Sequence, residues 1–252
     1  MRTPLDVHAH VLPDIAPGEL TALAAHVVAV TRTPDEYETV RHRDDPTTVW
    51  ALGCHPGLAG PQKKFDPDRF RQLAATAAVV GEVGLDGSSR VPLELQTANL
   101  TTILAILADT PLVTSLHSAG ATTELVDVIE RHPTPGLVLH WWRGSPDDTR
   151  RALDVGCYFS VNSRELRKPA VLGVAPKDRI LVETDHPFGD RSEAQPRRPG
   201  HMHKTLTALA ERWEVTYDEA VRRTWVNWRD LAVATATADR LPASFCTEML
   251  AA

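Results

Sequence analysis

Short apolar runs alternate with helix-like stretches along the whole chain, and this alternation limits the folds that the sequence can adopt. The apolar runs, each about as long as an ordinary strand, cover residues 4–8, 26–31, 48–53, 78–84, 112–116, 136–140, 157–161 and 179–183. Helical patterns cover residues 17–25, 34–42, 66–76, 92–108, 121–131, 146–155, 164–174, 200–213 and 216–238. Because neighbouring parallel strands need a crossover connection, strands separated by helices predict a parallel sheet covered by helices.

Eight strand–helix repeats are typical of a closed α/β fold, the TIM-like (β/α)8 barrel. Such a barrel usually needs about 250 residues, and this chain has 252. A distorted or seven-stranded barrel is a variant of the same prediction. An open, doubly wound sheet is the runner-up, but no glycine-rich phosphate loop follows the first run. Since no linker or low-complexity tract divides the chain, residues 1–252 are predicted to form a single domain.

Side chains that can bind metal close several of the apolar runs, at the points where strands would give way to loops. A parallel barrel brings the carboxyl ends of its strands to one mouth, where the active sites of this architecture lie. The sequence therefore predicts that these side chains meet in one metal site. The candidate ligands are His8, His10, Glu82, His117, His140 and Asp185.

The spacing of His8 and His10 suits a strand. Side chains alternate along a strand, so two histidines two residues apart point to the same side and can reach one ion. On a helix of about 3.6 residues per turn they would point apart. For this reason His201 and His203, which lie where a helix is expected to begin, are not predicted to be ligands.

Other polar and aromatic residues near these strand ends are candidates for substrate contacts. Trp141 and Trp142 directly follow His140, and an indole there can stack on a base or pack in the core, with packing favoured for one of the two. Arginines near the mouth can bind phosphate oxygens. The candidate substrate contacts are His55, Trp142, Arg143 and Arg191, with Arg164 as a further phosphate-binding candidate.

The charge of the chain limits how it can bind nucleic acid. The formal net charge is -6 at pH 7 and the pI is about 6.0, which argues against a protein that coats nucleic acid through a broad basic surface. A nuclease that draws its positive charge from metal ions in an acidic pocket fits this composition. Three widely spaced cysteines, no signal-peptide segment and no run of about 18 apolar residues predict a cytoplasmic protein without a membrane partner.

The motifs that carry the candidate residues resemble those of the TatD-type metal-dependent deoxyribonucleases of the amidohydrolase superfamily. They are DVHAH, GCHPG, GEVGLD, LH at 116–117, LHWWRGS and VETDHPF, and they follow the family's order from residue 6 to about 190. WVNWRDL further resembles the family's last helix. Within the family, GLDGS, HWWRGS and GCYFSVN are most similar to the TatD-type nuclease subunit of Qat anti-phage defence operons.

This resemblance implies a site for two divalent metal ions, with Mg²⁺, Mn²⁺ or Zn²⁺ as candidates. It also implies hydrolysis of DNA phosphodiesters, often as an exonuclease, and protein partners from a defence operon. The implied ligands are His8, His10 and Asp185 for one ion, His117 and His140 for the other, and Glu82 for both.

The chain departs from the family's pattern around the expected phosphate site. Gly87 and Ser88 stand where many members have an aromatic pair, and Ala119 stands where many have an arginine. Arg143 replaces a residue that would be small. On the fourth strand, Glu82 stands where other superfamily members bridge their metals with a carboxylated lysine, which disfavours dihydroorotase-like and phosphotriesterase-like proteins.

The predicted reaction is metal-assisted hydrolysis of a phosphodiester, with Asp185 and Glu82 as the catalytic carboxylates. Asp185 would orient the attacking water or accept its proton, and Glu183 would support a ligating histidine. Two alternatives stay open. One is hydrolysis of another bond, such as an aminoacyl-tRNA ester, and the other is a non-catalytic partner subunit of a defence complex.

Overall fold

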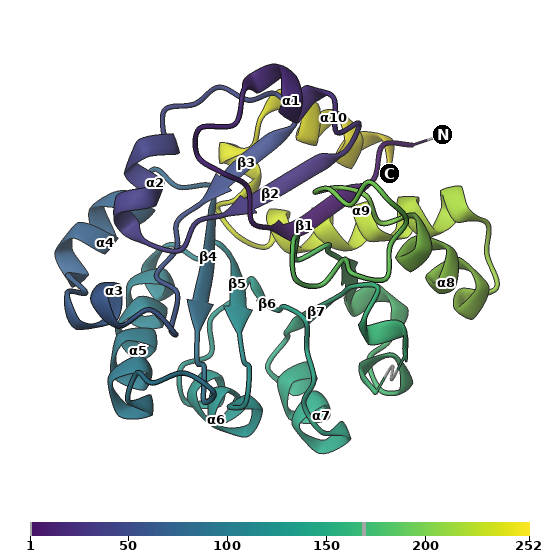
Figure 1. Cartoon of the computed structure of the whole chain (residues 1–252). Coiled ribbons are helices and arrows are strands. Elements are labelled where there is room, and N and C mark those ends of the chain that lie inside the picture. The colour runs from purple at the N-terminus through teal and green to yellow at the C-terminus, as the bar shows by residue number, and fades with distance from the viewer. Residues whose placement is uncertain (1, 168–169) are drawn as a thin grey trace.

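The computed structural model describes residues 2–167 and 170–252, with helices on the outside of a set of parallel strands (Figure 1). All eight predicted strands are confirmed, with bounds that shift by a few residues. They are β1 (Leu5–Ala9), β2 (His26–Val30), β3 (Thr48–Ala51), β4 (Val79–Gly84), β5 (Val113–His117), β6 (Leu137–Leu139), β7 (Tyr158–Val161) and β8 (Ile180–Val182).

The strands pair in chain order and all pairs are parallel. β1, β2 and β3 form one sheet, and β4 to β8 form a second. A doubly wound sheet would reverse its strand order at a switch point, so the runner-up fold is wrong. The sequential order is that of a TIM-like barrel, in the distorted form, because the ladder is interrupted at two seams.

The first seam lies between β3 and β4. It is bridged at Leu52 and Val80. The Leu52 amide donates to the Val79 carbonyl at 3.0 Å, and the Leu52 carbonyl accepts from the Gly81 amide at 2.8 Å. The Cys54 amide then donates to the carbonyl of Glu82 at 3.0 Å. This pairing places the end of β3 beside the candidate ligand on β4.

The second seam lies between β8 and β1 and closes the barrel. The Asp185 amide donates to the His8 carbonyl at 2.9 Å, and the His10 amide donates to the His186 carbonyl at 3.0 Å. Asp185 adopts a left-handed backbone conformation, with φ 42°, which is uncommon for a residue with a side chain. The two hydrogen bonds hold this turn, and they bring the ends of the first and last strands together.

Ten helices are described, and several begin at the capping residues that the sequence indicates. Asp66, Ser145 and Thr216 each accept a hydrogen bond from a backbone amide of the first helical turn. None of the described helices is both long and apolar enough to span a membrane. The helices are α1 (Pro17–Thr21), α2 (Pro34–Val40), α3 (Ala59–Lys63), α4 (Pro67–Ala74), α5 (Leu93–Asp109), α6 (Thr122–Arg131), α7 (Pro146–Asp154), α8 (His203–Trp213), α9 (Tyr217–Val233) and α10 (Ala243–Ala251).

Three segments differ from the predicted helices. Instead of one helix over 164–174, short 3-10 turns cover Glu165–Arg167 and Val171–Gly173, and residues 168–169 lie outside the described residues. The Arg164 amide donates to the Asn162 side chain at 3.1 Å, and such a side-chain turn competes with a helix. The helices α3 and α10 were not predicted, because Gly60 and Pro61 in α3 are typical of a loop and α10 follows the expected end of the chain's last helix.

The C-terminal helices complete the core. Trp225 and Trp228, three residues apart on α9, are buried, as is Phe245 of α10. The Trp225 indole donates to the Thr3 carbonyl at 2.8 Å, and the N- and C-termini lie near each other (Figure 1), where Arg2 donates to the C-terminal helix. α9 and α10 therefore cover the part of the barrel where the chain begins.

His26, at the start of β2, is buried against this aromatic layer without a polar partner. It is 4% exposed, and neither ring nitrogen has a hydrogen-bond partner. The rings of Trp225 and Phe245 lie edge-on to it, at centroid distances of 5.1 and 4.7 Å. Burial therefore lowers the pKa of His26 from its ordinary 6.5 to about 4, since the charged ring would lose its hydration.

This burial predicts a pH-dependent loss of stability that His26→Phe should remove. Between pH 6.5 and 4 the unfolded chain binds a proton at His26 and the folded chain does not, so His26 makes the protein less stable as the pH falls. Between pH 7 and pH 5 the expected contribution is about 2 kcal/mol. Urea unfolding at both pH values should show a smaller difference for His26→Phe than for wild type. The exposed His203→Phe should keep the wild-type difference, and an equal difference in all three proteins would contradict the prediction.

Candidate metal centre

The structure brings all six candidate ligands together at the carboxyl ends of five strands. They lie at and beneath the floor of a pocket of about 780 Å³. His8 lies in β1 and His10 just after it, Glu82 in β4, His117 at the end of β5, His140 just after β6 and Asp185 after β8. Binding of metal by these side chains stays a prediction.

One half of the cluster is formed by His8, His10, Glu82 and Asp185. The Nε2 atoms of His8 and His10 lie 3.7 and 3.5 Å from Oδ1 of Asp185. The same atoms lie 4.0 and 3.5 Å from Oε2 of Glu82. Donor atoms around a tetrahedral ion are ~3.4 Å apart when each bond is about 2.1 Å. These four distances are close to the spacing that one divalent ion requires, and the donor atoms of His8, His10 and Asp185 all lie within 4.8 Å of one another.

Several of these donor atoms are buried without a hydrogen-bond partner. Nε2 of His8, Oε2 of Glu82 and Oδ1 of Asp185 are among them. Leaving a buried polar atom unpaired costs roughly 1–3 kcal/mol, and three such atoms directed at one point are best explained by a cation that satisfies them together. This observation supports a metal site independently of the sequence motifs.

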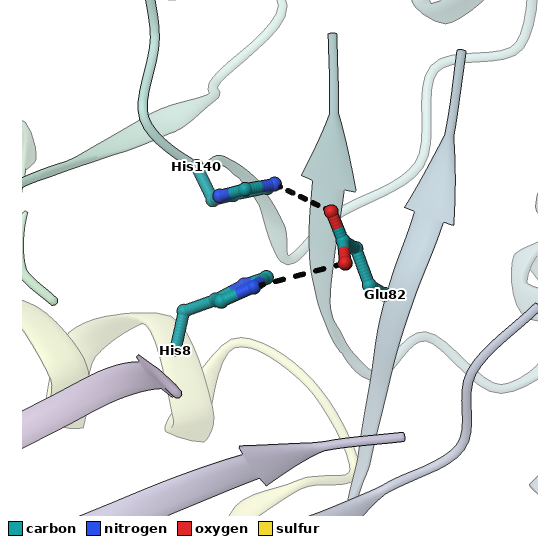
Figure 2. Close-up of side chains that lie close together, drawn as sticks. All are labelled: His8, Glu82 and His140. Atoms are coloured by element: carbon teal, nitrogen blue, oxygen red, sulfur yellow. Dashed lines mark hydrogen bonds and ion pairs between the residues drawn. The ribbon is translucent and has the colours of Figure 1, made fainter. Parts of the chain in front are cut away.

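The other half of the cluster is formed by His117 and His140 around the second oxygen of Glu82. Nε2 of His140 lies 2.9 Å from Oε1 of Glu82, and Nδ1 of His117 contacts the same oxygen. The two histidine nitrogens are 3.2 Å apart. Glu82 thus turns Oε1 to these two histidines and Oε2 to the first half, as Figure 2 shows for His140 and His8. A carboxylate in this position can bridge two ions.

Burial and neighbouring charges set opposite protonation tendencies for the two carboxylates. Burial raises the pKa of Glu82, but His117, His55 and His140 act against it and hold the pKa well below its usual range. Burial raises the pKa of Asp185 to about 9, and the nearby Glu183 contributes to this rise. Burial thus favours the protonated form of Asp185, and a bound divalent ion would favour its charged form.

Burial also keeps His8 neutral, which is the form that binds metal. Its pKa lies well below the ordinary value, chiefly because the ring is buried and next to His140. Nδ1 of His8 lies 2.7 Å from the hydroxyl of Ser115. When this nitrogen donates its hydrogen to Ser115, Nε2 keeps a lone pair directed at the cluster.

Three residues that support the cluster were not identified from the sequence. The buried carboxylate of Asp6 accepts hydrogen bonds from the amide and hydroxyl of Thr184, at 2.9 and 2.6 Å, and from the amide of Gly200 at 2.8 Å. Asp86 Oδ2 lies 3.9 Å from Nε2 of His117. Asp6 and Asp86 lie inside the motifs DVHAH and GEVGLD, and this position was the only sequence feature that could have identified them. Ser115, the third residue, lies outside the motifs of the sequence analysis, so no sequence feature pointed to it.

Glu183 lies behind the cluster, as the sequence predicts for a residue that supports a histidine. Its Oε1 is 3.8 Å from Nδ1 of His140. The same oxygen accepts a hydrogen bond from Asn162 at 3.0 Å, and its other oxygen accepts one from Ser160. These contacts hold the carboxylate in place beside the imidazole, which suits it to orient His140.

His55 faces the cluster but is suited to donate a hydrogen bond, and it is poorly suited to bind metal. Its Nδ1 accepts a hydrogen bond from the Gly57 amide at 2.9 Å, so in the neutral ring the proton is on Nε2. Nε2 lies 3.4 Å from Oε2 of Glu82. An N–H donor therefore points into the pocket beside the bridging carboxylate, in agreement with the predicted substrate-contacting role.

The predicted substrate contacts divide into residues that line the pocket and one that does not. Arg143 and Arg191 line it, together with Arg164 and Trp141. Trp142 is 1% exposed, and its indole donates to the Thr149 hydroxyl at 2.9 Å. The prediction that Trp142 contacts substrate is therefore wrong. Consecutive side chains at this strand end point in opposite directions, so Trp141 faces the pocket and Trp142 packs in the core.

Comparisons with known proteins point to one family for this chain. The family model described as TatD related DNase matches residues 5–232. The uncharacterized metal-dependent hydrolase YabD of Bacillus subtilis is 28% identical over 198 residues, which are 72% of this chain and 76% of YabD. The 3'-5' ssDNA/RNA exonuclease TatD of Cronobacter sakazakii is 32% identical over 148 residues, which are 54% of this chain and 56% of that protein. The match thus spans little more than half the length of that exonuclease.

Solved structures show the same fold. YjjV, a TatD homologue from Escherichia coli, superposes with a TM-score of 0.76 at 23% identity over 90% of this chain and 97% of its own. A TatD-family hydrolase from Entamoeba histolytica gives a TM-score of 0.72 at 15% identity, over 92% of this chain and 98% of its own. The TIM-like prediction is confirmed by these neighbours, and the family model covers most of the chain. The protein belongs to the TatD-related DNase family of metal-dependent hydrolases.

Proposed function

We propose that this chain is a two-metal phosphodiesterase that hydrolyses DNA from a strand end. The observation that carries the proposal is the division of the Glu82 carboxylate between two sets of histidines, with Asp185 completing the first set. Two-metal sites of this kind are suited to clamp a phosphate during displacement. One relative is named a 3'-5' ssDNA/RNA exonuclease, which supports an exonuclease. On this proposal residues 1–252 form a single hydrolase domain.

The residues around the cluster have distinct roles in the proposed reaction. Bound cations would polarise the phosphate and lower the pKa of a water molecule. Asp185, which a bound cation would hold in its charged form, would orient that water and accept its proton as the oxygen–phosphorus bond forms. His55 would donate a hydrogen bond from its Nε2–H to a phosphate oxygen. Arg143 and Arg191 would balance charge on the phosphate as the bond to the leaving oxygen breaks.

A role in anti-phage defence, with protein partners encoded beside it, and a cytoplasmic location are further parts of this proposal. The defence role and the partners are supported by the similarity of GLDGS, HWWRGS and GCYFSVN to the Qat nuclease subunit, and the location by the three widely spaced cysteines. Co-purification of the tagged chain with neighbouring gene products would test the partnership.

The metal requirement leads to a direct prediction. Treatment with EDTA should abolish hydrolysis and lower the melting temperature, and Mn²⁺ should restore both. At a free metal concentration 100 times Kd, the expected stabilisation is about 2.7 kcal/mol. Metal analysis and differential scanning calorimetry measure the two effects, with two ions per chain expected. The variant Glu82→Gln should lose the Mn²⁺-dependent shift, and full activity in metal-free protein would refute the proposal.

The bond that is cleaved can be tested with a substrate panel. The protein loaded with Mn²⁺ should hydrolyse single-stranded DNA, and chain-end labels at either terminus would show whether cleavage starts at an end. RNA and an aminoacyl-tRNA ester complete the panel. Hydrolysis of the ester without hydrolysis of DNA would replace the proposed activity with the alternative one.

A further inference from the structure

Two consecutive tryptophans at the end of β6 point in opposite directions. Trp142 is buried in the core, whereas Trp141 is half-buried and lines the metal-centred pocket. Trp141 adopts a left-handed backbone conformation with φ 40°. Such a conformation costs on the order of 1–3 kcal/mol for a residue with a side chain and is concentrated at functional sites. The strained turn places an indole at the pocket wall.

The Trp141 ring is held in place from the loop after β7. Its indole donates a hydrogen bond to Oε1 of Glu165 at 2.9 Å, and the Glu165 side chain is only 8% exposed. The guanidinium of Arg164 lies over the ring, 5.3 Å from its centroid. These contacts fix the plane of the indole without using any candidate metal ligand, so the wall is ordered independently of the cluster.

A second aromatic ring, Phe188, lines the same pocket from the loop after β8. It is 49% exposed, and its ring stands edge-on to His10 at a centroid distance of 5.6 Å. Large apolar side chains that stay this exposed are a small group in the described part of the chain. An exposed aromatic beside a candidate ligand is well placed to contact a bound substrate.

Charge is distributed unevenly around the mouth of the pocket. Arg143, Arg164 and Arg191 come from the loops after β6, β7 and β8. The loops after β4 and β5 and the first residue of α6 contribute small or uncharged side chains and one carboxylate, which are Asp86, Ser88, Ser118, Ala119, Gly120 and Thr122. The aromatic rings and the guanidinium groups thus share one half of the mouth. Aromatic side chains combined with basic groups are typical of proteins that bind single-stranded nucleic acid.

We propose that Trp141, Arg164 and Phe188 form a nucleobase-binding wall that takes the unpaired base next to the scissile phosphate. The inference rests on the proposed phosphodiesterase function and deepens it. A base within a duplex is paired and stacked on both sides, so it cannot lie against the wall unless the end of the strand is frayed. The wall therefore selects strand ends with an accessible base, while the arginines hold the flanking phosphates.

The wall can be tested with two single-stranded DNA oligonucleotides, one intact and one with base-free tetrahydrofuran residues in the last two positions at both ends. Wild-type protein with Mn²⁺ should favour the intact oligonucleotide in kcat/KM by about 10- to 100-fold, since stacking of one base is worth about 1–3 kcal/mol. In Trp141→Ala the ratio should fall to near one, mainly through a higher KM for the intact oligonucleotide. Trp141→Phe keeps an aromatic face and should keep most of the preference.

Controls separate a failure of the wall from a failure of the function. Trp213→Ala removes another half-buried tryptophan, on α8, and should keep the wild-type ratio. If Trp141→Ala does not fold, Arg164→Ala and Phe188→Ala test the same wall, and each should reduce the ratio. Wild-type cleavage with an unchanged ratio in all of these variants would overturn the inference. Absence of cleavage of either oligonucleotide by wild type would instead overturn the proposed phosphodiesterase.

Discussion

Asp185→Asn is expected to lower kcat/KM for DNA by on the order of 1000-fold or more while the protein stays folded. Changes behind the ligands of metal enzymes typically cost 10- to 100-fold, and this change removes a ligand charge and the proposed proton acceptor together. Asparagine has nearly the same shape, so the hydrogen bonds of the backbone seam at Asp185 are retained. Steady-state kinetics with Mn²⁺ and metal analysis are the measurements, and His8→Ala should show a comparable loss.

The matched control for His8→Ala is His201→Ala. His201 belongs to the second His-x-His pair of the sequence, and its ring Nδ1–H donates a hydrogen bond to the Pro196 carbonyl, 3.1 Å away. It should keep wild-type activity and metal content. Full activity in Asp185→Asn, or an equal loss in both histidine variants, would refute the assignment of the cluster as the active site.

Asp6→Asn is expected to reduce the free energy of unfolding by about 3 kcal/mol or more. The Asp6 carboxylate accepts from the Thr184 amide and hydroxyl, the Gly200 amide and, at 3.3 Å, the His8 amide. All of these groups have hydrogen to donate, so the amide nitrogen of asparagine would face a donor whichever way it is turned. Each buried donor left unpaired costs roughly 1–3 kcal/mol.

Chemical denaturation of the metal-free protein measures this effect. Asp68→Asn is the matched control, because the Asp68 side chain is exposed on α4, and surface changes of this kind are usually within about 0.5 kcal/mol. Comparison with Asp185→Asn separates the structural role of Asp6 from the catalytic role of Asp185, since Asp185→Asn should lose activity and keep most of its stability. An unchanged denaturation midpoint for Asp6→Asn would show that the seam does not depend on this carboxylate.

The strands and the cluster were predictable because each depends on local pattern and on one property of the barrel. A near-continuous apolar run such as Val79–Gly84 is typical of a strand covered on both faces. Once the strands are parallel and follow in order, their carboxyl ends must meet, so Glu82 and Asp185 converge although they are far apart in sequence.

Features that depend on three-dimensional packing were beyond the sequence. The choice between Trp141 and Trp142 depends on the backbone turn at Trp141, which no local pattern reveals. Asp6 acts through contacts with Thr184 and Gly200, 178 and 194 residues away along the chain. The helix α10 is weakly amphipathic, and its position is fixed by Phe245, which packs into the core. In each case the deciding partner lies on another element.

The two seams of the barrel give a bound cation a mechanical role. His8 lies in the three-stranded sheet and His10 directly follows it, whereas Glu82 lies in the five-stranded sheet and Asp185 follows its last strand, on either side of the two interruptions. An ion held by all four would act as a cross-link between the halves of the molecule, replacing the missing ladder with coordination bonds. Without the ion the shared hydrophobic core and the hydrogen bonds of both seams would still join the two sheets, so the ion would add its rigidity at the mouth of the barrel, where the four ligands meet.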